Sequence, residues 1–189
     1  MCIRDRLISA WEKMGKPKVF NFVELGPGDG SLTKVIISTL QKFPELNRAI
    51  KIYLYEKSLF LKKLQKQNIN NKRIKWIKNF NSIKKGPVIF FGNEFFDAIP
   101  IKQFSNINNE LFEKCYSVKN NIDIIEKFIR CNKKDIAQIM TFGTLKKLKF
   151  IEFPKKGLIE LNPIIKKINK LSGGILLIDY GYLNSNNSN

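Results

Sequence analysis

The sequence contains no histidine, and its three cysteines are widely separated. Histidine is the commonest general base and the commonest metal ligand in proteins, so its absence excludes the most familiar acid–base and metal-dependent mechanisms. Cys2, Cys115 and Cys131 form no CxxC pair, which argues against a zinc site. We therefore expect no metal site, and the scattered thiols favour a reducing compartment.

Long apolar runs and arginine are also scarce. No run approaches the roughly 20 apolar residues of a membrane span, and the N-terminus lacks the apolar region of a secretory signal. The formal net charge is +18, but arginine occurs only at positions 4, 6, 48, 73 and 130, and lysine supplies the rest. Because arginine is the better bidentate reader of phosphate, we expect a solvated basic surface, with an RNA methyltransferase as a minor alternative.

The residues that are present indicate a globular α/β protein. The chain has 189 residues, 43% of them hydrophobic and 26% charged, which suits one domain with room for an extension. Apolar runs alternate with helical patterns up to Pro100, and this alternation predicts a parallel sheet with right-handed crossovers. We expect strands at 19–25, 50–55, 73–78 and 88–92, and helices at 7–14, 32–43 and from Ser58 onward.

The rhythm changes after Pro100. Short strands separated by asparagine-rich turns are expected at 101–104, 111–118 and 122–130. The pattern then predicts a helix at 136–148, a strand at 157–161 and an apolar strand at 175–180. Asn162 followed by Pro163 is typical of a helix start, with asparagine as the cap and proline at the first helical position.

A glycine-rich turn follows the first strand, in the stretch 23–32 (VELGPGDGSL). Gly26, Gly28 and Gly30 lack the Cβ that would block a tight turn and the approach of a ligand. The spacing is GxGxG, and Ser31 stands where a dinucleotide-binding loop has its third glycine. The motif therefore predicts a nucleotide-like ligand without identifying it.

Acidic residues around this turn favour a ligand that carries positive charge. Glu24 and Asp29 flank the glycines and would repel a pyrophosphate. Glu56 ends the second strand, where a carboxylate can accept hydrogen bonds from both ribose hydroxyls. S-adenosylmethionine has a sulfonium, an ammonium and a ribose but no phosphate, so it fits better than NAD. An NAD-dependent oxidoreductase remains the alternative.

Further polar residues fall at the ends of later strands. Asn93, Glu94 and Asp97 follow the fourth strand, and Asp179 ends the last one. Ligands of open parallel sheets bind at the carboxyl ends of the strands, so these residues are candidates for the reaction centre. The alternatives are a lysine salt bridge for Glu94 and a turn cap for Asp97. For Asp179 they are closure of the site or a strand-end cap.

Four motifs in this order carry a resemblance: VELGPGDGSL, YEKS, NEFFDAIPIKQF and GILLIDYGY. Between Val19 and Tyr182 the chain resembles the MidA-like family of S-adenosylmethionine-dependent methyltransferases. That family includes the mitochondrial protein-arginine methyltransferase that assists complex I assembly. The resemblance implies a Rossmann-like class I fold, S-adenosyl-L-methionine as cofactor, and a protein arginine as substrate, in a subunit of a respiratory complex.

The resemblance also implies site residues and roles. By resemblance, Gly26, Gly28 and Glu56 would bind the donor, and the turn and its charge add Glu24 and Gly30 as candidates for the same role. The reaction centre would be lined by Asn93, Glu94 and Asp97, with the two carboxylates holding the arginine guanidinium.

We expect four segments of the chain to have separate structural roles. We expect an N-terminal helix and linker at 1–18, with 1–6 interpreted as non-native, the cofactor-binding core at 19–100, a β-rich substrate-side insertion at 101–156, and a return to the core sheet at 157–189. Family members continue beyond this point, so we interpret the chain as a fragment without the C-terminal strands. A non-catalytic assembly module that retains the fold is the second alternative. The family implies the cytoplasm of a bacterium or a mitochondrion, and the oligomeric state stays open.

Overall fold

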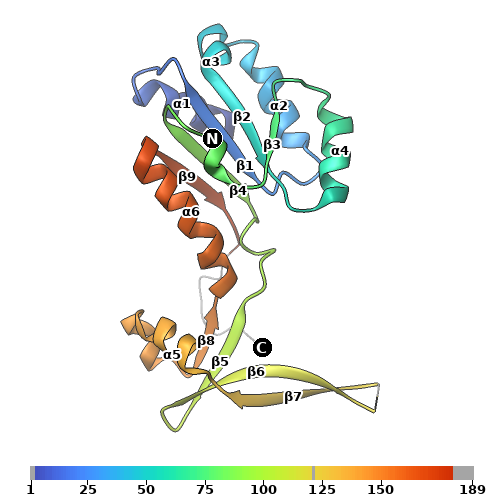
Figure 1. Ribbon diagram of the computed structural model, residues 1–189, viewed down its shortest axis with the longest axis vertical. Coiled ribbons are helices and arrows are strands. Elements are labelled where there is room, and N and C mark those ends of the chain that lie inside the picture. Colours follow the sequence, from blue (N-terminus) through green and yellow to red (C-terminus); the bar gives the residue numbers. More distant parts are fainter. Residues whose placement is uncertain (1–2, 121, 181–189) are drawn as a thin grey trace. The chain divides into compact units, whose positions relative to one another are not determined.

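The computed structural model describes residues 3–120 and 122–180 (Figure 1). The chain divides into two compact units. The core unit comprises residues 1–98 and 161–189, and the insertion unit is Ile99–Glu160. Each unit has its own sheet and its own buried apolar residues.

The core unit contains a five-stranded sheet in which all neighbouring strands are parallel. Its strands are β1 (Phe20–Leu25), β2 (Ile50–Tyr55), β3 (Lys75–Ile77), β4 (Val88–Asn93) and β9 (Gly173–Ile178). The order is β3-β2-β1-β4-β9, so the direction of winding reverses between β1 and β4. Ligands of such sheets bind at this switch point. The predicted parallel α/β fold is confirmed.

Helices supply the two apolar layers of the core unit (Figure 1). They are α1 (Ile3–Lys13), α2 (Ser31–Leu40), α3 (Pro44–Ala49), α4 (Leu59–Ile69), the 3₁₀ turn η1 (Phe80–Ser82) and the part of α6 (Lys155–Leu171) from Leu161 onward. Residues of α1, α2, α3 and α4 pack with Phe20 and Phe22 on one face of β1. Val23 and Leu25 pack on the other face with η1 and α6. All six residues of β1 are buried because the sheet is covered on both faces.

The insertion unit contains an antiparallel four-stranded sheet in the order β7-β6-β5-β8. Its elements are β5 (Lys102–Ile107), β6 (Glu110–Lys119), β7 (Asp123–Arg130), α5 (Lys133–Met140), the 3₁₀ segment η2 (Gly143–Lys147) and β8 (Phe150–Phe153). Its core is small, with buried Phe104, Leu111, Cys131, Ile139, Ile151 and Phe153. The strands predicted between Ile101 and Arg130 are present, with ends that differ by a few residues.

The structure corrects the prediction around Pro163. The predicted strand at 157–161 is wrong, because these residues are helical and belong to α6. Asn162 and Pro163 do not open this helix but lie inside it. Apolar residues recur at helical spacing through α6, with Leu158, Ile164 and Ile168 packed against buried clusters. This periodicity outweighs the local cap-and-proline signal.

Other boundaries also differ from the prediction. Helix α1 begins at Ile3, whose side chain packs against the core, so residues 3–6 continue the helical pattern. The predicted helix at 136–148 is α5 followed by η2, and α3 and β8 were not predicted. Gly181 and Tyr182 of the last motif lie outside the described residues. Among the helices that are described, none combines the length and the apolar character needed to cross a membrane.

Candidate functional site

The glycine turn after β1 adopts backbone angles that favour glycine. Gly26, Gly28 and Gly30 have φ values of 60°, 55° and 86°. The N–H of Gly26 donates to the carbonyl of Tyr55 at 3.0 Å. A Cβ at Gly30 would lie 2.8 Å from Ile69 Cδ1, whereas a Cβ at Gly28 would meet no atom within 4 Å. The turn is therefore packed at Gly30 and open at Gly28, where a ligand can approach the backbone.

Gln65 of α4 connects this turn to the end of β2. Its side chain is fully buried, and its Nε2 donates to the carbonyl of Gly28 at 2.8 Å and to Glu56 Oε2 at 3.1 Å. Its Oε1 accepts a hydrogen bond from Trp76 Nε1 at 2.9 Å. Every polar atom of the amide is thus used to fix the spacing between the glycine turn and Glu56.

Glu56 lies just beyond β2 and is 8% exposed. Its Oε1 accepts from the N–H of Ser58 at 2.7 Å and its Oε2 from Gln65. The Ser58 hydroxyl in turn caps α4 by accepting from the N–H of Leu61. A carboxylate has about four acceptor positions, so two remain for a ligand such as the ribose diol.

Glu24 of β1 is 3% exposed and accepts a hydrogen bond from the Thr33 hydroxyl of α2. Burial raises the pKa of Glu24 to about 7; the Thr33 hydrogen bond opposes this rise and the charge of Asp29 adds to it. The carboxyl group therefore ties the strand to the helix behind the glycine turn. Almost none of Glu24 is exposed, and its direct contact with the donor stays a prediction.

Asp29 occupies the N-terminal end of α2. Its Oδ1 accepts from the N–H of Ser31 at 3.0 Å and its Oδ2 from the Ser31 hydroxyl at 2.6 Å. These hydrogen bonds lower the pKa of Asp29, so the carboxylate is charged at neutral pH. A helix N-terminus is an anion site only while its N–H groups and dipole are free for the anion. Here the chain supplies its own anion, which disfavours a bound pyrophosphate.

Three carboxyl groups gather where β4 and β9 end. Asn93 closes β4 and pairs with Ile178 of β9, so Glu94 and Asp179 leave adjacent strands. Glu94 has φ 53°, and its N–H donates to the carbonyl of Ile178 at 2.8 Å. The pKa of Asp179 is raised by burial, by a hydrogen bond with Asp97 and by the charges of Asp97 and Glu94. This arrangement concentrates acidic groups on an exposed turn, which suits an organic cation such as a guanidinium.

Phe95 lies between the two groups of residues. A Cβ at Gly26 would lie 3.0 Å from Phe95 Cδ2, and the Phe95 ring contacts that of Tyr55 edge-on with centroids 6.2 Å apart. Strands β1 and β4 are parallel neighbours, so the glycine turn after β1 and the turn with Glu94 and Asp97 after β4 lie at the same end of the sheet. In the part of the chain that is described, no cluster of acidic or cysteine side chains could hold a metal ion.

Two site features were not predicted from the sequence. Gln65 belongs to a helix with many polar residues, and no local signal marks it as buried. Thr33 likewise looks like an ordinary first-turn residue. For Asp179 the sequence left two roles open, and its grouping with Asp97 depends on the neighbouring positions of β4 and β9. For Gln65, the one hint in the sequence is its position nine residues after Glu56, which is compatible with the hydrogen bond between these two side chains.

Comparison with known proteins places the chain in a family. The family model described as "Putative S-adenosyl-L-methionine-dependent methyltransferase" matches residues 2–189. The protein arginine methyltransferase NDUFAF7 of Xenopus laevis is 24% identical over 200 residues, which is 93% of this chain and 46% of that protein. The human NDUFAF7 is 22% identical over 199 residues, covering 93% and 45%. The chain thus spans about half the length of the curated relatives it matches.

Solved structures agree on the fold. A Burkholderia thailandensis protein, described as a "COG1565 superfamily member and likely methyl transferase" and crystallised with S-adenosyl-homocysteine, superposes with a TM-score of 0.70 at 15% identity. The match covers 95% of this chain and 46% of that one. A second crystal structure from the same organism gives a TM-score of 0.73. The family description names the cofactor that the sequence predicted. The chain belongs to the family of S-adenosyl-L-methionine-dependent methyltransferases.

Proposed function

We propose that the protein transfers a methyl group from S-adenosyl-L-methionine to an arginine side chain of a protein. The observation that carries this proposal is the Gln65 contact, which joins the open glycine turn and the Glu56 carboxylate into one cradle. An exposed group of carboxylates lies at the ends of β4 and β9 beside it. The cradle suits a nucleoside, and the carboxylates suit a cationic acceptor.

The residues present fit this cofactor. Gly28 leaves space above the turn, and Glu56 has acceptor positions left for the ribose hydroxyls. Both features suit an adenosyl group. Asp29 adds negative charge next to the turn, which favours a ligand with a sulfonium and an ammonium. The same charge disfavours NAD, the alternative considered from the sequence.

The carboxylates give the acceptor its orientation. When bound, S-adenosyl-L-methionine would supply the methyl group to a substrate nitrogen, with the electron pair of the sulfur–carbon bond remaining on sulfur. Glu94 and Asp97 would hold the guanidinium by charge-assisted hydrogen bonds, which aim one nitrogen at the methyl carbon. The proton that leaves this nitrogen would pass to one of these carboxylates and then to water. Asn93, at the end of β4, would line the same centre.

The relatives indicate the class of substrate. Proteins named protein arginine methyltransferase match most of this chain, and they are also named mitochondrial. We extend the arginine substrate to this chain, with a respiratory-complex subunit as the specific target. The compartment would be the cytoplasm of a bacterium or a mitochondrion. The segment at 101–156 would take part in substrate selection.

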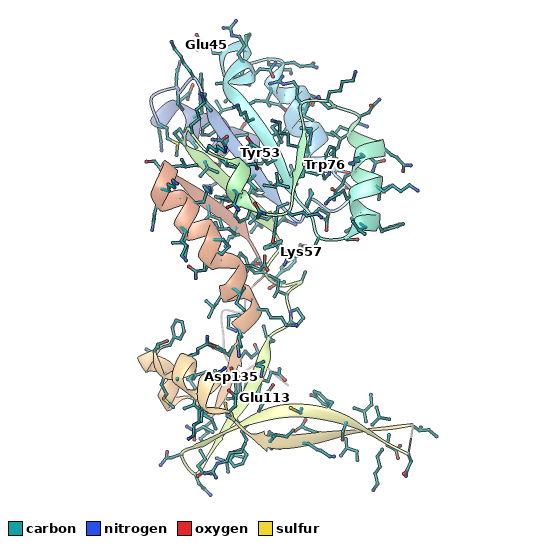
Figure 2. All side chains as sticks on the ribbon, viewed as in Figure 1. Glu45, Tyr53, Lys57, Trp76, Glu113 and Asp135 are labelled. Atoms are coloured by element: carbon teal, nitrogen blue, oxygen red, sulfur yellow. The ribbon has the colours of Figure 1, made fainter. Side chains whose placement is uncertain are left out.

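Calorimetry with S-adenosyl-homocysteine tests the cradle directly. The 189-residue chain should bind, and Glu56→Ala should abolish the heat. Glu45→Ala is the matched control, because Glu45 is an exposed acid on α3 (Figure 2). A Glu56→Ala variant whose affinity stays within twofold of the original would show that the ribose assignment is wrong.

Methyl transfer tests the carboxylates. With labelled cofactor and a protein lysate, Glu94→Gln should keep cofactor binding and reduce arginine methylation about 10²-fold. Binding without any methylation by the original chain would instead favour the second candidate, a non-catalytic assembly module. The absence of binding would contradict both.

A further inference from the structure

Among the strands that the structure describes, β7 of the insertion unit pairs with a neighbour on one side only. It stands at the end of the strand order β7-β6-β5-β8. Strand β5 pairs only with Glu110–Glu113 of β6, so the remainder of β6 pairs with β7 alone. Residues 114–119 and 123–128 therefore form a two-stranded ribbon, which Figure 1 shows as the long hairpin of β6 and β7. An isolated pair of strands is marginally stable in water, so this ribbon gains from another partner.

The ribbon exposes apolar side chains. Val118 is 67% exposed and Ile124, opposite it, is 75% exposed. Tyr116, Ile122, Phe128 and Ile129 are exposed as well. Edge strands that are long, apolar and without proline act as templates for pairing with another chain. The partner that fits the ribbon is therefore one that adds a strand.

Charge favours a second copy of this protein as that partner. The whole chain carries +18, whereas residues 110–130 contain four acidic and four basic residues. Repulsion opposes contact between two copies over most of the basic surface and is weakest at a segment without net charge. Self-association is thus least opposed at the ribbon.

The charged residues of β7 that are left without an ion pair can pair with the same residues of a second copy. Three pairs join Glu110 with Arg130, Glu113 with Lys102, and Lys114 with Glu126. Within the described residues, Asp123 and Lys127 of β7 have no ion pair, and neither does Lys119 of β6. Asp123 and Lys127 have opposite charge, lie on one face of the strand, and stand symmetrically about Ile125.

We propose that β7 pairs antiparallel with β7 of a second copy, with Ile125 on the two-fold axis. Asp123 then faces Lys127 of the second copy, and this contact occurs twice. Ile125 faces its own counterpart, and the two four-stranded sheets become one of eight strands. An axis at Glu126 or at Lys127 would set two like charges opposite each other, whereas the axis at Ile125 is the one that sets Asp123 opposite Lys127. The proposal concerns assembly and does not depend on the proposed methyl transfer.

A cysteine on the axis tests the register. Residues directly opposite in antiparallel strands have Cβ atoms about 4.5–5.5 Å apart, close enough for a disulfide after slight adjustment. Ile125→Cys should give a disulfide-linked dimer under mild oxidation. Phe128→Cys is the matched control, because position 128 would face position 122 and not itself. No cross-link at position 125, or equal cross-linking at both positions, would overturn the register.

Charge reversal tests the contact in solution. In sedimentation equilibrium of the 189-residue chain, Lys127→Asp should raise the dimer dissociation constant about tenfold, because two attractive contacts become repulsive. Asp123→Lys should do the same, and the double variant should restore the original affinity. Lys134→Asp on α5 makes the same charge change on an exposed helix and should have no effect. A monomeric original chain, or a double variant that does not recover, would overturn the proposal.

Discussion

The core unit buries the carboxyl group of Glu24 and the insertion unit that of Asp135, and the pKa values of these two groups are shifted in opposite directions. In the core unit, Glu24 is covered by the sheet and α2, and its side chain accepts a hydrogen bond from the Thr33 hydroxyl. In the insertion unit, Asp135 is fully buried and receives hydrogen bonds from Lys102, Lys155 and Asn132. Burial without a cation raises the pKa of Glu24, whereas two lysines outweigh burial and lower the pKa of Asp135 to about 2.

The difference follows from how much apolar surface each unit can bury. The core unit has two apolar layers on a parallel sheet, and these tolerate an uncompensated carboxyl group. The insertion unit has six buried apolar residues, so its helix and strands depend on the ion cluster around Asp135. Figure 2 shows Asp135 and Glu113 close to one another near the base of the ribbon, and Lys102 bonds to both. The comparison predicts that the two units respond differently to loss of a buried charge.

The largest effect is expected for Asp135→Asn. This change removes the charge that compensates Lys102 and Lys155, and breaking a buried ion pair costs about 3–5 kcal/mol. The insertion unit should lose protection against amide hydrogen exchange while β1 and β4 of the core unit keep theirs. Glu152→Gln, at an exposed position of β8, is the control and should shift stability by less than about 0.5 kcal/mol. Equal loss of protection in both units would contradict the comparison.

The next effect is a gain of stability from Glu24→Gln. The unfolded chain releases the Glu24 proton near its ordinary pKa of 4.5, whereas the folded chain holds it to about 7. The folded state therefore binds more protons between these values, and stability falls as pH rises through this window. The glutamine variant should lack this fall and be more stable at pH 8 by about 2–3 kcal/mol.

Urea unfolding at several pH values measures this effect. Glu12→Gln, at an exposed position of α1, is the matched control and should keep the fall in stability between pH 4.5 and about 7. Parallel pH profiles for the original chain and Glu24→Gln would show that Glu24 is not the group responsible.

A smaller effect is expected for Gln65→Leu in the core unit. The change deletes the hydrogen bonds to Gly28 and Glu56 and puts an apolar side chain of similar size in place of the amide. Affinity for S-adenosyl-homocysteine should fall by about 1–2 kcal/mol. Trp76→Phe removes the donor to Gln65 Oε1 and part of the ring surface but leaves both Gln65 Nε2 hydrogen bonds in place, so it should have less than half this effect. The readout is calorimetry at a temperature where both variants are folded, and equal affinities would remove Gln65 from the site.

The smallest effect compares two helix caps. Ser58→Ala removes the cap of α4 and should cost about 1 kcal/mol. Asn132→Ala removes the cap of α5 and also the hydrogen bond to Asp135 Oδ2, so it should cost more. Chemical denaturation of both variants decides the order. A larger loss for Ser58→Ala would show that the ion cluster is not critical to the insertion unit.

Strands of the core unit could be predicted because their sequences are continuous apolar runs bounded by glycine, proline or charged residues. Ile50–Tyr55 is the strand β2 at the predicted bounds. The helix at Pro163 could not be placed, because a proline after asparagine gives the same local signal inside a helix as at its start. Strand β8 has four residues, too few to show a periodicity.

The sequence by itself determined the parallel sheet, the family and the residues at the strand ends, because apolar runs, glycine spacing and motif order are local properties. Only the tertiary structure decided how those residues work together. Gln65 is buried because α4 packs beside the glycine turn, and Asp179 meets Asp97 because β9 pairs with β4. The raised pKa of Glu24 and the lowered pKa of Asp135 likewise depend on which groups the fold places around each carboxyl. Burial and long-range contacts depend on residues that are distant in the sequence, so no short stretch of sequence predicts them.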